Sequence, residues 1–302
     1  MDFGRLANVD NVDFLLPADH MANEGLFARL SAGRARPQIL LGSPQWGHPG
    51  YVGKIYPERT PQGDYLHHYA RQFPTVELNA TYYGVRPDLI ERWRDAVPDG
   101  FRFCPKLERT ISHDRQLVGA EAETEAFIDG IERFGDRLGP AWLLLPESFG
   151  PERAQVLAGF VRRWPRRIQL AVELRHPAWF TGGRIPDAIL RLFEETETMA
   201  VLTDVAGRRD VLHQRVTSRN VFLRFAGNGL HPTDFERVDA WVARLASWIE
   251  GGVRSLYIFL HQPQEELNVE LAERFAGEFQ RRCGIEVQAP RRLERVEQGQ
   301  LF

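Results

Sequence analysis

Eight short apolar runs, separated by longer amphipathic stretches, recur along the chain. They lie at Gln38–Ser43, Thr75–Asn79, Phe101–Lys106, Ala141–Pro146, Ile168–Leu174, Met199–Asp204, Val221–Phe225 and Ser255–His261. A strand that is apolar along its whole length is buried on both faces, as in a parallel sheet covered by helices. Eight such strands, spaced by roughly 20 to 40 residues, predict an α/β fold with a single TIM-type (β/α)8 barrel.

The stretches between the runs carry helical patterns. Pro87–Trp93 opens with a proline and an acidic residue, and Ala120–Leu138 and Asp234–Ile249 place apolar side chains on one side of a helix. The alternative for alternating strands and helices is an open, doubly wound sheet. Gly42–Gly47 lacks the glycine spacing that approaches a pyrophosphate, and the count of eight favours closure.

The length of 302 residues suits one such barrel with an addition at each end. We expect an N-terminal extension over residues 1–37, the barrel over 38–283, and a C-terminal tail over 284–302 that is rich in Arg, Glu and Gln. No stretch between the runs has the composition of a linker that would divide the barrel.

The charge and the cysteines exclude several classes of protein. A formal net charge of −3 argues against coating nucleic acid by bulk charge, although a local basic patch is compatible with it. Cys104 and Cys283 are too few and too far apart for a disulfide framework or a cysteine-based zinc site. No apolar run reaches the length of a membrane span, and the first residues lack a signal-peptide pattern. We therefore expect a cytoplasmic protein without a membrane partner.

Polar side chains gather where the predicted strands end. They are Glu77, Asn79, Lys106, Glu173, Arg175, His176, Asp204, Arg224 and His261. In a TIM-type barrel these ends form one mouth, where catalysis takes place. A charge in an apolar strand is costly unless it is paired, so these residues must meet one another or a ligand. A neutral ion-pair network that only closes the barrel is one interpretation; a catalytic site is the other, and the placement of the charges at one end favours it.

The residue types suggest catalytic roles. The candidate catalytic residues are Glu77, Lys106, Glu173 and Asp204. Either glutamate could act as a general acid or base, and Lys106 with Arg175 and Arg224 would hold a phosphate or carboxylate. Lys106 could also act as a base or a Schiff-base nucleophile, but a lysine paired with a carboxylate stays protonated, so this role is less favoured.

A second group of residues is predicted to bind the substrate. Its members are Asn79, Arg175, His176, Arg224, Tyr82, Trp46, His113 and His261. Trp46 and Tyr82 come just after strand ends, where an aromatic ring either stacks on a flat ligand or packs the rim. His113 follows the third strand closely enough to lie above the barrel mouth. There it would either cap the loop by a hydrogen bond or contact the substrate.

A divalent metal is a less favoured alternative. Glu77, Glu173, Asp204 and His261 would be adequate ligands. No pair of histidines has the spacing of a metal motif, and three nearby cations would oppose a metal ion. We therefore predict neither a metal nor another cofactor.

Several of these segments also carry a family resemblance. They are Gly42–Trp46, Thr75–Tyr83, Phe101–Lys106, Ile111–His113 and Val172–Trp179. The pattern resembles the domain-of-unknown-function 72 family, also called YecE-like, and runs from about Ile39 to about Glu278. The resemblance implies a TIM-type barrel. It implies no activity, because the family is named for lacking an established one.

The last five residues, Gln298–Phe302, resemble the short peptides by which bacterial proteins dock on the replication sliding clamp. In such a peptide Gln298 would make a polar contact, while Leu301 and Phe302 would enter an apolar pocket of the partner. The alternative is a tail that folds back onto its own barrel.

Three functions remain open at this point. The leading hypothesis is an enzyme, a hydrolase or lyase, that uses acid–base chemistry on a phosphate-bearing or other anionic substrate, with nucleic acid in DNA repair or processing as one such substrate. The second is a non-catalytic module that binds nucleic acid or associates with the sliding clamp. The third is a small-molecule sugar or carboxylate enzyme.

Overall fold

Each of the eight predicted apolar runs contains a β-strand. The structure is a computed structural model that describes residues 3–30, 36–183 and 185–293. Its strands are β1 (Gln38–Ser43), β2 (Thr75–Leu78), β3 (Arg102–Pro105), β4 (Ala141–Leu144), β5 (Leu170–Glu173), β6 (Met199–Ala200), β7 (Leu202–Asp204), β8 (Asn220–Ala226) and β9 (Ser255–His261). The sixth run forms two strands, because its first half pairs with β5 and its second half pairs with β8.

The strand pairs of the described residues are parallel, but they form two sheets. Six strands pair in the order β3-β2-β1-β9-β8-β7, and three pair in the order β4-β5-β6. The edges β3 and β4 meet through single bridges, Phe103 with Leu138 and Lys106 with Trp142. The fold is therefore α/β with mostly parallel sheets. The predicted closed eight-stranded barrel is not confirmed, since these bridges are too few for a continuous ladder.

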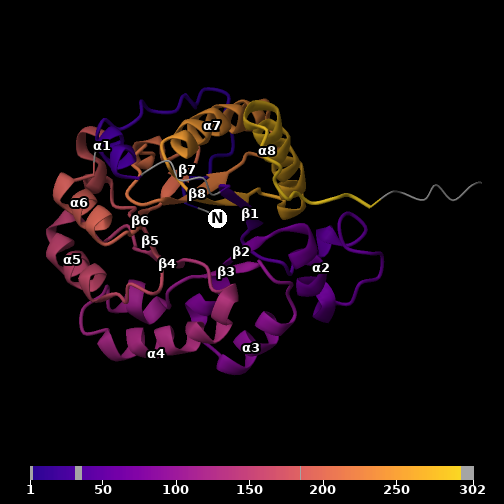
Figure 1. The fold of residues 1–302 in the computed structure, drawn as a ribbon, viewed down its shortest axis with the longest axis horizontal. Coiled ribbons are helices and arrows are strands. Elements are labelled where there is room, and N and C mark those ends of the chain that lie inside the picture. Colours follow the sequence, from indigo (N-terminus) through magenta and orange to yellow (C-terminus); the bar gives the residue numbers. More distant parts are fainter. Residues whose placement is uncertain (1–2, 31–35, 184, 294–302) are drawn as a thin grey trace, which may run out of the picture.

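Helices surround the strands. They are α1 (Ala22–Arg29), α2 (Tyr65–Gln72), α3 (Pro87–Asp95), α4 (Glu121–Ile131), α5 (Ala154–Arg163), α6 (Asp187–Glu195), α7 (Pro232–Glu250) and α8 (Asn268–Cys283). Figure 1 shows the strands near the middle, with α2 to α8 following one another around them. The helical patterns at Pro87–Trp93 and Asp234–Ile249 are confirmed as α3 and α7. The long pattern Ala120–Leu138 becomes α4 followed by a kinked 3-10 segment, Glu132–Arg137.

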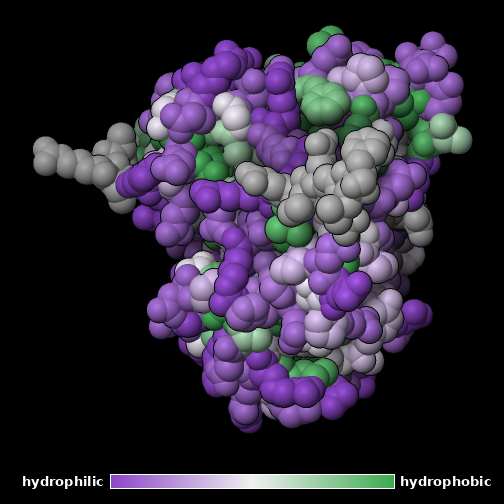
Figure 2. Space-filling view, turned by 90° about the vertical axis from the view of Figure 1, so that its right-hand side faces the viewer, coloured by the Kyte–Doolittle hydropathy of each residue, from purple (hydrophilic) through white to green (hydrophobic). Residues whose placement is uncertain are grey.

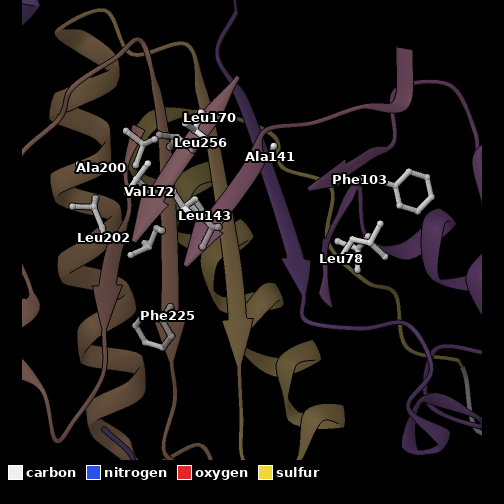
Figure 3. Packing of buried hydrophobic residues seen from close by; sticks show 14 of the residues in the cluster. Leu78, Phe103, Ala141, Leu143, Leu170, Val172, Ala200, Leu202, Phe225 and Leu256 are labelled. Carbon is white, nitrogen blue, oxygen red and sulfur yellow. The ribbon is translucent and has the colours of Figure 1, made fainter. Parts of the chain in front are cut away.

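Alternate residues of the strands enter two separate apolar clusters. In β8, Val221, Leu223 and Phe225 belong to an outer cluster, which strand and helix residues build together. Figure 3 shows strand residues of this cluster, Phe225 among them. Phe222 belongs to an inner cluster, as the two-residue period of a strand requires. The members of the inner cluster are Leu40, Cys104, Trp142, Leu144, Ala171, Met199, Val201, Phe222, Tyr257 and Phe259. None of these comes from a helix, so the strands enclose this cluster among themselves.

The N-terminal extension packs against the later part of the chain. Leu26 of α1 is buried in the outer cluster, and the Asp19 carboxylate accepts a hydrogen bond of 2.9 Å from Nε1 of Trp248 in α7. The Phe14 ring lies 4.7 Å from the guanidinium carbon of Arg237, also in α7. The extension is thus part of the folded unit over its described residues.

The described start of the C-terminal tail also lies against the fold. The Leu293 amide donates to the Lys54 carbonyl at 2.9 Å, and Arg292 pairs with Glu273 of α8. The face drawn in Figure 2 is mostly hydrophilic, and its hydrophobic residues form small, separate groups. Throughout the part of the chain that the structure describes, no helix combines the length and the apolar character that a membrane span requires.

Candidate active site

Four predicted site residues meet on the inner faces of the strands. Arg224, Glu173 and His261 each follow a member of the inner cluster by two residues, in β8, β5 and β9, and therefore share its face. Glu77 joins them from β2. Each of the four is at most 3% exposed. The inner face is thus apolar along most of its length and charged at the carboxyl ends of the strands.

Arg224 is the centre of this group. Its Nε and Nη2 donate to the two carboxylate oxygens of Glu77 at 2.8 and 3.0 Å. Its Nη1 donates to Oε2 of Glu173 at 2.9 Å. The guanidinium carbon lies 4.4 Å from the ring centre of Trp142, which belongs to the inner cluster. A two-point contact with one carboxylate and a further contact with another commit this guanidinium to the protein.

These contacts determine the charge states. Burial alone would raise the pKa of Glu77 and of Glu173, but the charge of Arg224 holds the pKa of Glu77 well below its usual range. Arg175 and Arg224 lower the pKa of Glu173. Burial opposes the charge of Arg224, yet the carboxylates of Glu173 and Glu77 raise its pKa. Both glutamates are therefore ionised near neutral pH, and at that pH they are poor proton acceptors.

Two more predicted residues, Arg175 and Asn79, complete this ion cluster, and His261 also contacts Glu77. Nε of Arg175 donates to Oε1 of Glu173 at 2.8 Å, and Nδ2 of Asn79 donates to Oε1 of Glu77 at 3.1 Å. Nε2 of His261 lies 3.1 Å from Oε2 of Glu77. Burial lowers the pKa of His261, so a neutral ring that donates from Nε2 is the form that fits the carboxylate.

Lys106 lies beside this cluster and differs from it. Its Nζ is 4.2 Å from the ring centre of Tyr82 and 5.0 Å from that of Trp142. Among the described residues this ammonium makes neither an ion pair nor a side-chain hydrogen bond. Burial lowers the pKa of Lys106 to about 8; the charge of Glu77 opposes this shift and that of Arg224 adds to it. This pKa is closer to neutral pH than that of an ordinary lysine.

The backbone around Lys106 is held in place. Its amide donates to the Leu78 carbonyl at 3.1 Å, and its carbonyl accepts from Oγ1 of Thr81 at 2.8 Å. The amide of Leu107 donates to the Trp142 carbonyl at 2.9 Å. The lysine thus projects from a fixed point between β2 and β4, which is what a precise catalytic geometry requires.

Tyr82 and His113 lie on the outer side of Lys106. The two rings meet edge to face, with their centres 5.3 Å apart, and Nδ1 of His113 lies 2.8 Å from Oγ of Ser112. Burial, followed by the charge of Lys106, lowers the pKa of His113 to about 4. The imidazole is therefore neutral at physiological pH, and the structure brings both predicted residues to the site.

Asp204 lies in a different network. Its carboxylate accepts from Nε1 of Trp241 at 2.6 Å and pairs with Arg237 at 2.9 Å, both in α7, and with Arg209. These partners use the carboxylate to attach the end of β7 to α7. The structure does not bring Asp204 to the ion cluster, so we leave it out of the catalytic set.

The remaining predicted residues lie at the rim. Nδ1 of His176 accepts from the Ala178 amide at 3.0 Å, which stabilises the turn after β5. The Trp46 ring packs edge to face against Trp93, with centres 5.3 Å apart, and against Phe103 at 6.4 Å. His176 thus stabilises a turn, and Trp46 packs against its neighbours at the rim.

A cavity of about 420 Å³ lies next to Glu77. Trp46, Asn79, Tyr83 and Glu265 also line it. Oε2 of Glu265 is buried and has no hydrogen-bond partner within the described structure, and burial raises the pKa of this carboxyl group. The sequence reasoning missed Glu265, because it lies four residues beyond β9 in a polar stretch without a strand or motif to mark it.

Two aromatic residues were also missed. Trp142 lies against both Lys106 and Arg224. The sequence signal for it was the two-residue period of β4, which places Trp142 and Leu144 on the same, inner face. The Phe3 ring lies 4.2 Å from the guanidinium carbon of Arg175 and 4.8 Å from that of Arg208. No local pattern marks Phe3, since more than a hundred and seventy residues separate it from Arg175 in the sequence.

The carboxylates considered as metal ligands are engaged in ion pairs. No group of three or more His, Cys, Asp or Glu side chains within the described residues has the arrangement of a metal site. The oxygens of Glu77 are already used by Arg224, His261 and Asn79. The ion cluster is therefore built from internal ion pairs.

With this geometry in place, the chain can be assigned to a class of proteins. The family described as protein of unknown function DUF72 matches residues 40–294, and the chain belongs to this family. The UPF0759 protein YecE of Escherichia coli K12 is 31% identical over 244 residues, which cover 74% of this chain and 86% of YecE. The UPF0759 protein YunF of Bacillus subtilis 168 is 26% identical over 155 residues, which cover 47% of this chain and 52% of YunF.

Two crystal structures of DUF72 family proteins have a similar fold. TM1631 of Thermotoga maritima MSB8 aligns with a TM-score of 0.65 over 80% of this chain and 99% of its own. EF0366 of Enterococcus faecalis V583 aligns with a TM-score of 0.62 over 85% of this chain and 100% of its own. Both are 19% identical to this chain, so the likeness concerns the fold alone.

Proposed function

We propose that this protein is an enzyme that binds an anionic substrate beside the ion cluster and uses Lys106 to transfer a proton. The observation that carries the proposal is the position of Lys106 between the rings of Tyr82 and Trp142, with no carboxylate paired to it in the described structure. A group whose pKa is near the working pH is the best proton donor and acceptor. The pKa of Lys106, lowered by burial to about 8, meets this condition.

The charge balance supports an anionic substrate. Glu77 and Glu173 carry two negative charges, which Arg224 and Arg175 offset. A protonated Lys106 then leaves one positive charge in excess, in a site where burial strengthens electrostatic attraction. A phosphate or a carboxylate of the substrate would neutralise it. Phosphate-bearing substrates of this kind include nucleic acid, and the reaction would be that of a hydrolase or lyase.

The proposal also includes a TIM-type barrel in the cytoplasm. In support of the barrel, the inner cluster draws on strands of both sheets, and the Val201 amide donates to the Val172 carbonyl where the sheets approach each other. The bridges between Phe103 and Leu138 and between Lys106 and Trp142 add to this. Two free thiols, Cys104 and Cys283, suit a reducing compartment.

A titration of the lysine signals tests the proposal. Only Lys54 and Lys106 are lysines, so protein labelled with [13C]lysine gives two sets of Cε–Hε signals in NMR, which Lys106→Arg assigns. We expect the Lys106 signal to titrate near pH 8. Inorganic phosphate should raise this pKa, because a bound anion favours the ammonium form.

Lys54 is the internal control, since it lies in an ion pair with Glu270 outside the site. Titration of Lys106 near the ordinary lysine value of about 10.4 would contradict the proposal. So would a phosphate effect of equal size on both lysines, because it would indicate general ionic screening.

The C-terminal tail is proposed to dock on a bacterial sliding clamp. Gln298, Leu301 and Phe302 lie outside the described residues. We expect a fluorescent peptide of the last ten or so residues to bind a bacterial sliding clamp with micromolar affinity, since one apolar anchor pair gives modest binding energy. Fluorescence polarisation measures this, and Leu301→Ala/Phe302→Ala should abolish it. Equal binding of the two peptides would refute the anchor.

A further inference from the structure

Lysine is rare in this chain. Of the 38 lysines and arginines, only Lys54 and Lys106 are lysines. Lys54 has an ordinary structural role: its Nζ pairs with Glu270 at 2.8 Å and donates to the Glu266 carbonyl. Arginine would serve for charge alone at position 106, as it does at Arg175 and Arg224 in the same site. The chemistry that arginine lacks is a deprotonated, nucleophilic nitrogen.

The surroundings of Lys106 suit that chemistry. Aromatic rings lie against the ammonium on two sides, and a ring lowers the cost of the charged form far less than a carboxylate would. The side chain is only partly buried, whereas Glu77, Glu173 and Arg224 are fully buried. Lys106 is thus a member of the site that an incoming molecule can reach.

We infer that Lys106 is a nucleophile that forms an imine with an aldehyde or ketone bearing an anionic group. This inference rests on the proposed function, because it uses the same amine and the same positive charge. It goes beyond that function by naming a covalent intermediate and a carbonyl substrate. It also reverses the expectation that Lys106 would be paired with a carboxylate and so stay protonated.

The step balances without an oxidant, a reductant or a cofactor. The ammonium first loses a proton, and the nitrogen lone pair then forms a C–N bond with the carbonyl carbon. The C=O electron pair moves to oxygen, which takes up the proton that nitrogen releases. The hydroxyl of this carbinolamine takes up a further proton and leaves as water, while the nitrogen lone pair forms the C=N bond. One proton is lost from the ammonium at the start and one is taken up when water leaves. The protonated imine therefore carries the same charge as the ammonium that it replaces.

The neighbouring groups fit both charge states. The protonated imine carries the same single positive charge as the ammonium, and the carboxylates of Glu77 and Glu173 favour that charge at Lys106. His113, which lies against Tyr82, is neutral at pH 7 and adds no further positive charge beside the protonated imine. A protonated imine withdraws electrons from the adjacent carbon, and bond cleavage at that carbon is the chemistry of a lyase.

Reductive trapping tests the imine. We would incubate the protein at pH 7 with glyceraldehyde 3-phosphate and sodium cyanoborohydride, digest it at arginine, and measure the mass of each lysine peptide. The expected result is an adduct on Lys106 at least ten-fold more abundant than on Lys54. The single variants Lys54→Arg and Lys106→Arg keep the charge and leave one lysine each, and only the first should retain rapid labelling.

The outcomes separate the inference from the proposed function. Equal labelling of the two lysines, or none on Lys106, overturns the imine. If the NMR titration still places the pKa of Lys106 near 8, the proton-transfer function survives that result; if it does not, both fall. Labelling of Lys106 by uncharged glyceraldehyde at the same rate supports the imine but contradicts the anionic substrate of the proposed function.

Discussion

Replacing Arg224 by methionine is expected to destabilise the fold by about 3–5 kcal/mol at pH 7. The guanidinium is the shared partner of Glu77 and Glu173, which are 0% and 1% exposed. Methionine has a similar length but no charge, so two carboxylates would remain buried close to each other. Urea unfolding at pH 7 measures the loss, and a change below about 1 kcal/mol would contradict the role assigned to Arg224.

The pH dependence of stability gives a second test of the Arg224→Met variant. In the wild type the folded-state pKa of both glutamates is lowered, so their stabilising effect is present above the unfolded pKa of about 4.3 and is lost as the pH falls through the folded value. In the variant both carboxyl groups take up protons more readily. The difference in stability between wild type and variant should therefore narrow as the pH falls from 7 into the acidic range, where the folded variant binds protons that the folded wild type does not.

A triple variant is the matched control. Glu77→Gln/Glu173→Gln/Arg224→Met removes all three charges while it keeps the approximate volumes. It should recover most of the stability that Arg224→Met loses, because a neutral set of groups is often as stable as a buried ion network. If the triple variant is as unstable as the single one, the loss arises from packing against Trp142 and the unpaired carboxylates are not its cause.

Replacing Lys106 by methionine is expected to have the opposite sign, with a gain of up to about 3 kcal/mol at pH 7, since one pKa unit corresponds to about 1.4 kcal/mol. Burial lowers the folded-state pKa of this lysine from 10.5 to about 8, so at neutral pH the folded protein carries a charge that its surroundings disfavour. Methionine fills a similar volume between Tyr82 and Trp142 without that charge. A gain in stability on loss of a site residue is typical of functional positions.

The pH window follows from the sign of the shift. Between the folded value of about 8 and the reference value of 10.5, the unfolded chain binds more protons at Lys106 than the folded chain does. The wild type therefore gains stability as the pH rises through this window. The advantage of Lys106→Met should be complete below about pH 8 and decline above it.

Urea unfolding at pH 7 and pH 9.5 measures this decline. Lys54→Met is the control, and it should lose stability because it removes an ion pair with Glu270. A Lys106→Met protein that is less stable than the wild type at pH 7 would show that Lys106 is a stabilising structural lysine.

Local patterns predicted most of what positions the site. The apolar runs marked the strands, and the expectation that polar residues at the strand ends meet is confirmed for Glu77, Glu173, Arg224 and His261. Lys106, Tyr82 and His113 could be placed at the same end, because each follows a strand closely. The run Met199–Asp204 was one strand in the sequence and two in the structure, since the switch of pairing partner leaves the local pattern unchanged.

The partners of the charges could not be predicted in this way. Asp204 ends its strand just as Glu173 does, yet it pairs with Arg237 and Arg209 outside the ion cluster. Glu265 and Phe3 reach the site from segments without a periodic pattern. Contacts across the fold depend on how distant segments pack against each other. The spacing of residues within one segment does not predict them.

The sequence by itself determined where the strands lie and that acids and bases collect at their carboxyl ends. It could do so because an apolar run and the polar residues that end it are local properties of the chain. Only the tertiary structure decided which charges are neutralised: Arg224 meets Glu77 across 147 residues of chain, while Lys106 meets two aromatic rings. That difference in partners, which depends on distance and burial, distinguishes an ion pair that holds the fold from an amine that can react.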